Sequence, residues 1–143
     1  MIKEWLKNLS GTKWVGNGEL WLDPEGNDAS NYACELKIDE NIIYYSWFYE
    51  KELRKGSFTF NDDGAIWTDN WHQKKAVQCS HVPEAWGVFT VFHEYEVPES
   101  PNWGWRSKLS ERPDSSLVLQ MTNITPWGEE GRAVRMIFAH EQA

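Results

Sequence analysis

The sequence predicts an all-β protein, a closed antiparallel up-and-down barrel of about ten strands with a short amino-terminal helix plugging one end. Three observations predict this fold. Ten of the 143 residues are tryptophan, spread from Trp5 to Trp127, and so many large rings are carried only where they line a core or a cavity. Apolar residues alternate in short runs after the first few residues. The turns between these runs are short, which favours antiparallel neighbours, and closing the sheet removes its two edges.

The first predicted element is the helix. Its apolar residues recur at helical spacing, and they are Ile2, Trp5, Leu6 and Leu9. The pair Ser10-Gly11 comes directly after them, and glycine just past an apolar-periodic segment is a typical helix stop. We therefore expect one short helix over residues 2–9.

Everything after the helix is predicted to be strand. The predicted segments are 12–22, 31–39, 41–51, 54–61, 65–71, 75–80, 86–96, 103–110, 116–125 and 132–140. Turn residues separate them, as at the tight hairpin Asp62-Asp63-Gly64. An even number of strands lets the first and the last pair antiparallel, and the length suits a single domain over residues 1–143.

The connections of an up-and-down barrel alternate between its two ends. The order of the strands therefore predicts at which end of the barrel each connecting segment lies. One end would collect the connections 23–30, 52–53, 72–74, 97–102 and 126–131. Trp71, His72, Trp103 and Trp127 would then surround an aromatic mouth, and the helix would lie at the opposite end. A single bulged strand through residues 71–75 would invert this assignment for the rest of the chain.

Composition restricts the partners. The chain has 14 lysines and arginines against 22 aspartates and glutamates, a formal charge of −8, which repels nucleic acid. No apolar run resembles a signal peptide or a membrane span. Only two cysteines are present, Cys34 and Cys79, on predicted strands that are not neighbours, so we expect free thiols. These features predict a cytoplasmic protein that binds neither nucleic acid nor membrane.

The opening of the first strand carries a resemblance to a known group of proteins. The run Leu9-Ser10-Gly11-Thr12-Lys13-Trp14-Val15-Gly16-Asn17-Gly18, straight after a short helix, resembles the start of a calycin barrel, the group that contains lipocalins and fatty-acid-binding proteins. The resemblance implies structural roles for Gly11 and for Trp14 at the closed end. It also implies that an arginine of the last strand, Arg132 or Arg135, packs across the Trp14 ring, where guanidinium stacks favourably on indole.

The spacing Trp14-x-Gly16-x-Gly18 also resembles the opening of nitrobindin-like haem barrels. That family binds iron through a histidine on its final strand. Here the middle of the final strand carries arginines, and its one histidine, His140, stands at the extreme end. We therefore expect no cofactor and keep the haem barrel as a less favoured alternative.

The segment 42–49, Ile-Ile-Tyr-Tyr-Ser-Trp-Phe-Tyr, is aromatic on both faces, because successive side chains of a strand alternate sides. Periodicity does not decide which face is inner, and we take Tyr45 and Trp47 as cavity-lining candidates. The outer set either contacts a second copy of the chain in a homodimer, contacts the helix, or is simply exposed.

Arginines within apolar strands are the most informative charged residues. An arginine that points inward needs a partner and would select an anionic group such as a carboxylate. The ligand-binding candidates are Tyr45, Trp47, Trp71, His72, Trp103, Arg106, Trp127 and Arg135, and the structural candidates are Gly11, Trp14 and Arg132.

Catalytic and metal sites find little support in the sequence. The histidines lie on separate segments without ligand spacing, so no metal site is predicted. Asp69 precedes His72 by three residues, an offset that on an extended strand places the two side chains on opposite faces. No nucleophile elbow, phosphate loop or dinucleotide fingerprint is present.

The predicted function is therefore binding of a small hydrophobic or amphipathic ligand, including one that bears a carboxylate, in the barrel cavity. The alternative is an isomerase or hydrolase that uses the same cavity, with His72 or a tyrosine such as Tyr45 as acid or base. A histidine or tyrosine that faces the cavity, with a carboxylate partner and a perturbed pKa, would favour the enzyme. The sequence leaves the identity of the ligand open.

Overall fold

The computed structural model describes residues 2–21, 29–83, 85 and 87–141. One helix and ten strands follow each other along the chain. They are α1 Ile2–Leu9, β1 Lys13–Trp21, β2 Ala29–Ile38, β3 Ile42–Tyr49, β4 Glu52–Asn61, β5 Gly64–Asp69, β6 Gln73–His81, β7 Phe89–Tyr95, β8 Trp103–Glu111, β9 Leu117–Ile124 and β10 Glu130–His140. The predicted helix and all ten predicted strands are confirmed, with small shifts at their ends.

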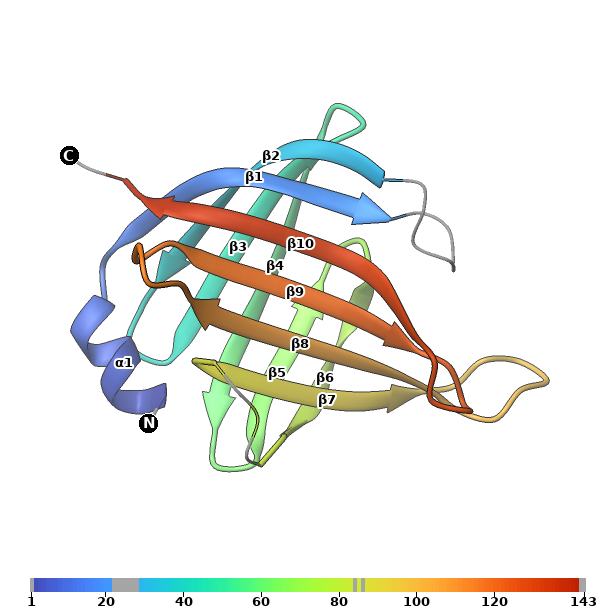
Figure 1. Ribbon diagram of the computed structural model, residues 1–143. Helices are drawn as coiled ribbons and strands as arrows, with labels where there is room; N and C mark the ends of the chain where they lie inside the picture. The colour runs from blue at the N-terminus through green and yellow to red at the C-terminus, as the bar shows by residue number, and fades with distance from the viewer. Residues whose placement is uncertain (1, 22–28, 84, 86, 142–143) are drawn as a thin grey trace.

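The strands form one closed antiparallel barrel (Figure 1). Each strand pairs with its neighbours in sequence, and β1 closes the barrel against β10 from Trp14 opposite His140 to Leu20 opposite Val134. Closure gives every strand two partners, although β6 and β7 pair only at Ser80 with Phe92 and at His81 with Val91. The other junctions are longer and leave little exposed edge. The predicted fold class is confirmed.

Helix α1 lies at one end of the barrel, and the β7–β8 and β9–β10 connections lie at the other (Figure 1). Leu6 is buried among the core residues. Gly11 ends the helical segment with a φ of +86°, and its N–H donates to the carbonyl of Ile38 at 2.8 Å. This left-handed turn, which glycine adopts without a steric penalty, directs the chain into β1. Among the described residues, no helix has both the length and the apolar character needed to cross a bilayer.

The pairing register decides which face of β3 is inside. Ile43, Tyr45 and Trp47 are buried, whereas Tyr44 and Phe48 are 44% and 55% exposed on the outer face. Room for the inner set comes from the facing strand, where Gly56 pairs with Tyr45. A Cβ at Gly56 would lie 2.2 Å from the Tyr45 ring, so the missing side chain allows the ring to lie flat against β4.

The turn between β5 and β6 was the uncertain point of the predicted arrangement. Strand β5 ends at Asp69 and β6 begins at Gln73, so two strands are present and the later connections keep their predicted ends. Strand β10 has a register shift between Arg132 and Val134. An extra residue of this kind bends a strand at the rim of a barrel.

Candidate functional site

A pocket of about 340 Å³ lies at the end of the barrel opposite α1. The β5–β6 turn and the adjoining ends of β1, β8, β9 and β10 supply its walls. Its lining residues are Leu20, Trp21, Trp71, His72, Trp103, Trp105, Asn123, Gly131, Arg132 and Ala133. We call this the mouth pocket.

His72 lies between two indoles at this end. The centroid of its imidazole is 5.8 Å from that of Trp47, with the planes 24° apart, and 5.1 Å from that of Trp105. Trp71 packs edge-on against Trp47 at 5.8 Å and against Tyr49 at 5.6 Å. The side chains of the β5–β6 turn therefore fold inward across the barrel.

Aromatic rings continue below this layer. Trp67 stacks on Trp105 at 5.5 Å and on Phe58 at 6.2 Å, and it contacts the imidazole of His93 at 5.5 Å. Spacings of this size are those of rings in direct contact. The space available to a ligand is consequently at the mouth, above the packed rings.

A buried hydrogen-bond network anchors the turn from below. Asp69 is 1% exposed. Its Oδ1 accepts hydrogen bonds from the backbone N–H of Trp71 at 2.7 Å and of His72 at 2.9 Å, and its Oδ2 accepts one from the hydroxyl of Tyr45 at 2.5 Å. The Tyr45 oxygen in turn accepts a hydrogen bond from Nε1 of Trp67 at 2.9 Å. A carboxylate with this many donors is satisfied despite its burial.

The side chain of His72 turns back over Asp69, with Nδ1 3.6 Å from Oδ1. The expectation that the two side chains point to opposite faces is wrong. It assumed an extended strand through both residues, whereas β5 ends at Asp69 and the carboxylate caps the turn that follows. At 3.6 Å the contact is an electrostatic one, longer than a hydrogen bond.

Burial raises the pKa of the Asp69 carboxyl, but the His72 side chain, the Tyr45 hydroxyl and the His72 backbone N–H more than offset it, so the pKa lies below its usual range. Burial, with the charge of the nearby Asp69, raises the pKa of Tyr45 well above its usual value. At neutral pH the network thus holds an ionised aspartate beside a protonated tyrosine.

Two indole donors flank His72 without a partner. Within the described ranges, Nε1 of Trp47, Nε1 of Trp105 and Nδ1 of His72 are buried and make no hydrogen bond. An indole nitrogen can only donate. This layer therefore buries three ring nitrogens that no described group satisfies.

The structure does not bring Arg106 or Arg135 into the mouth pocket. Trp105 points inward on β8, so the next residue, Arg106, points outward and pairs with Glu130. Arg135 pairs on the outer face with Glu19, with its Nε 2.9 Å from Oε1. Each of these two arginines already forms an ion pair with a carboxylate of the protein.

Arg132 does line the mouth pocket, where its guanidinium carbon lies 5.3 Å from the centre of the Trp21 ring. It forms no ion pair with any described residue. The resemblance placed it across Trp14 at the closed end, and this placement is corrected. Trp14 instead contacts the ring of His140 at 4.9 Å and donates its Nε1–H to Thr12 at 3.0 Å.

The two remaining candidates for the mouth, Trp103 and Trp127, differ in how far they are buried. Trp103 lines the pocket, and its Nε1–H donates to the hydroxyl of Ser100 at 3.2 Å. Trp127 is 70% exposed and meets Trp103 edge-on at 6.4 Å. Trp127 therefore stands beside the mouth pocket and outside its lining.

Sequence reasoning overlooked Trp21, Trp105 and Asn123 as lining residues and dismissed Asp69. The alternation that places Trp103 inward also places Trp105 inward, so this signal was available. An aspartate at the end of a strand and three residues before a histidine is typical of a turn capped by its own side chain.

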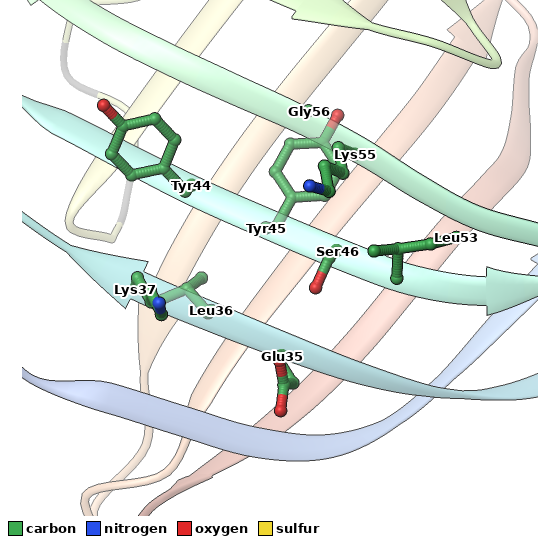
Figure 2. Close-up of a pocket in the computed structure, with 9 residues that line it drawn as sticks. All are labelled: Glu35, Leu36, Lys37, Tyr44, Tyr45, Ser46, Leu53, Lys55 and Gly56. Carbon is green, nitrogen blue, oxygen red and sulfur yellow. The ribbon is translucent and has the colours of Figure 1, made fainter.

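A larger concavity of about 400 Å³ lies on the outer face of β2, β3 and β4 (Figure 2). Its open side chains are those that alternate with the buried residues, namely Glu35, Lys37, Tyr44, Ser46, Leu53 and Lys55. No buried unpartnered polar atom of the described chain belongs to its lining. The mouth pocket, with its four indoles and an imidazole held over the buried Asp69, is the better candidate despite its smaller volume.

The histidine of the final strand does not reach the pocket. His140 is exposed at the end of the barrel that carries α1, so the haem alternative lacks the ligand position on which it depends. Within the described ranges, no three His, Cys, Asp or Glu side chains gather closely enough to hold a metal ion.

The barrel is consistent with a calycin-like fold in its closure, strand order and amino-terminal helix. Neither a family model nor a curated protein matches this chain in sequence.

Proposed function

We propose that this protein is a calycin-like binding protein whose mouth pocket holds a small hydrophobic or amphipathic ligand. One observation carries the proposal. Four indoles, those of Trp21, Trp71, Trp103 and Trp105, line one concavity together with the polar side chains of His72, Asn123 and Arg132. Concave sites with apolar walls and a few convergent polar groups are typical of small-molecule binding.

The polar end of the ligand would lie toward Arg132. This arginine lines the mouth pocket and has no carboxylate among the described residues, whereas Arg106 and Arg135 are each paired on the outer face. A guanidinium binds a carboxylate through two parallel hydrogen bonds. A ligand with a carboxylate at one end and an apolar body among the indoles fits the pocket best.

The two cysteines support the cytoplasmic location that forms part of this proposal. Cys34 and Cys79 are both free and buried. Burial raises the pKa of each thiol to about 12, so both stay protonated and unreactive at neutral pH. A chain of this kind is suited to a reducing compartment.

Equilibrium binding tests the proposal. The fluorescence of 1-anilinonaphthalene-8-sulfonate is titrated against the folded protein, and fatty acids and retinoic acid then compete for the dye. We expect saturable binding at one site, and we expect Arg132→Gln to weaken carboxylate ligands about tenfold while leaving the matching alcohols unchanged, because it removes a charged hydrogen bond.

Arg106→Gln is the matched control, because it removes an arginine of the outer face and should leave binding unchanged. A folded protein that binds none of these compounds saturably would contradict the proposed function. Equal loss for acids and alcohols in Arg132→Gln would contradict the assignment of the polar end.

A further inference from the structure

We propose that the mouth pocket is also a proton-transfer site, in which His72 acts as a general base on a planar carbonyl compound held among the indoles. The inference rests on the proposed function only in requiring that the mouth pocket bind a ligand. It adds an isomerase activity to that binding.

The position of His72 gives its two ring nitrogens different surroundings. Nδ1 is buried and lies 3.6 Å from Oδ1 of Asp69. Since His72 lines the mouth pocket, Nε2, on the other side of the ring, is the nitrogen left to meet a ligand. A carboxylate beside Nδ1 favours the tautomer with the proton on Nδ1, which leaves the lone pair on Nε2.

Asp69 is a positioning residue in this site. The Tyr45 hydroxyl and two backbone N–H groups hold its oxygens, so the carboxylate cannot rotate away from the imidazole without losing hydrogen bonds in a buried place. Trp47 and Trp105 hold the imidazole from both sides. The base is thereby preorganised before any ligand arrives.

Two further polar side chains of the mouth pocket suit a developing negative charge on oxygen. Arg132 lines the pocket and brings a guanidinium that forms no ion pair with any described residue. Asn123 accepts a hydrogen bond from Tyr95 on its Oδ1, which leaves its amide nitrogen as a donor. Donors aimed at a forming oxyanion stabilise the transition state of proton abstraction next to a carbonyl.

The step conserves atoms and electrons without a co-reactant. Nε2 takes a proton from the carbon next to the carbonyl, the C–H electron pair forms a C=C bond, and the carbonyl π pair moves to oxygen to give an enolate. The proton then returns from Nε2 to another carbon of the conjugated enolate, the C=O bond forms again, and the product is an isomer of the substrate. Among the residues that the structure describes, the lining of the pocket includes no Ser, Thr, Cys or Lys, which favours direct proton abstraction over a covalent intermediate.

The test uses 5-nitrobenzisoxazole, a planar compound that opens when a base removes one ring proton. The C–H pair forms the nitrile, the N–O bond breaks, and the coloured phenolate product reports the rate. We expect saturable turnover by the wild-type protein. His72→Gln should lower the rate about 100-fold, the size expected for loss of a general base, and the exposed His81→Gln on β6 should leave it unchanged.

The variant Asp69→Asn tests whether Asp69 positions the His72 imidazole for catalysis or only stabilises the fold. It should lower kcat about tenfold, as losing a carboxylate that orients a histidine typically does, while KM and the dye affinity stay close to wild type. Thermal unfolding of each variant shows whether it is folded.

A measurement on the wild-type protein tests the site without any variant. The turnover rate at each pH should follow the fraction of His72 that is deprotonated, which NMR reads from the signals of its ring. Asp69 on β5 faces the imidazole of His72, and the guanidinium of Arg54 on β4 lies 4.5 Å from the ring of the adjacent Trp71. Arg132 on β10 lines the same pocket, and the flanking Trp47 and Trp105 carry no charge.

The outcomes distinguish the two proposals. Binding of 5-nitrobenzisoxazole without turnover above that of free imidazole would overturn the proton-transfer site and leave the binding function intact. Equal rates for wild type and folded His72→Gln, or a rate that ignores the titration of His72, would overturn it as well. Failure of this compound and of the dye panel to bind would contradict the binding function itself.

Discussion

Asp69 and His72 are three residues apart in the chain, and Oδ1 of the first lies 3.6 Å from Nδ1 of the second. The aspartate ends β5 and caps the turn with its side chain, and the histidine comes back over it at the mouth of the barrel. One short turn thus joins a buried carboxylate to the pocket in which an imidazole is accessible to a ligand.

The hydrogen bond from Tyr45 to Asp69 should contribute measurably to stability. Tyr45→Phe keeps the ring and removes the hydroxyl that donates to the buried carboxylate and accepts from Trp67. We expect a loss of about 1–3 kcal/mol in the free energy of unfolding, because a buried charged acceptor loses a donor. Urea denaturation measures it. Tyr44→Phe, on the exposed outer face of the same strand, should change it little, and equal effects would contradict the role assigned to the network.

Adding a side chain at Gly56 should destabilise the barrel. A Cβ at this position would lie 2.2 Å from the Tyr45 ring, so Gly56→Ala must displace that ring within a packed core. We expect about 1–3 kcal/mol of destabilisation. Ser57→Ala, the next residue on the outer face, is the control. Stability of Gly56→Ala equal to that of the control would show that the ring moves at no cost.

Gly11 should be sensitive to substitution for a different reason. Nothing lies within 4 Å of a Cβ at Gly11, but its φ is +86°. Gly11→Ala should therefore cost about 1 kcal/mol through backbone strain alone. Gly11→Asn should cost less, because asparagine tolerates this conformation better. A larger loss for asparagine than for alanine in thermal or urea unfolding would contradict the conformational explanation.

Stability should fall on acidification because of His93. Its imidazole is buried beside Cys79, with Nδ1 3.5 Å from Sγ, and burial lowers its pKa. The unfolded chain therefore binds a proton more readily than the folded one. Stability contributed by the neutral ring is complete above the unfolded pKa of about 6.5 and declines below it until the folded pKa is reached.

Unfolding midpoints between pH 7.5 and pH 5 measure this decline. His93→Gln should flatten the profile in this range, whereas the exposed His81→Gln should keep it. A profile that is unchanged in His93→Gln would assign the acid sensitivity to another group.

Much of the architecture was determined by local features of the sequence. The alternating runs and the short turns between them place all ten strands, and the spacing of Ile2, Trp5, Leu6 and Leu9 places the helix. Because short connections force antiparallel neighbours, these features also predicted the closed strand order and the end at which Trp71, His72 and Trp103 meet.

The sequence by itself thus determined the barrel and the end that carries the site, since alternation and turn chemistry act between neighbours in the chain. Only the tertiary structure decided the inner face of β3, because both of its faces are equally apolar and pairing across from Gly56 makes the choice. It also decided that Arg132 lies exposed against Trp21 at the lining of the mouth pocket, while Arg106 and Arg135 pair with Glu130 and Glu19. The fold of the β5–β6 turn, which brings His72 over Asp69, depends on donors from Tyr45 and the turn backbone that assemble only when the barrel closes.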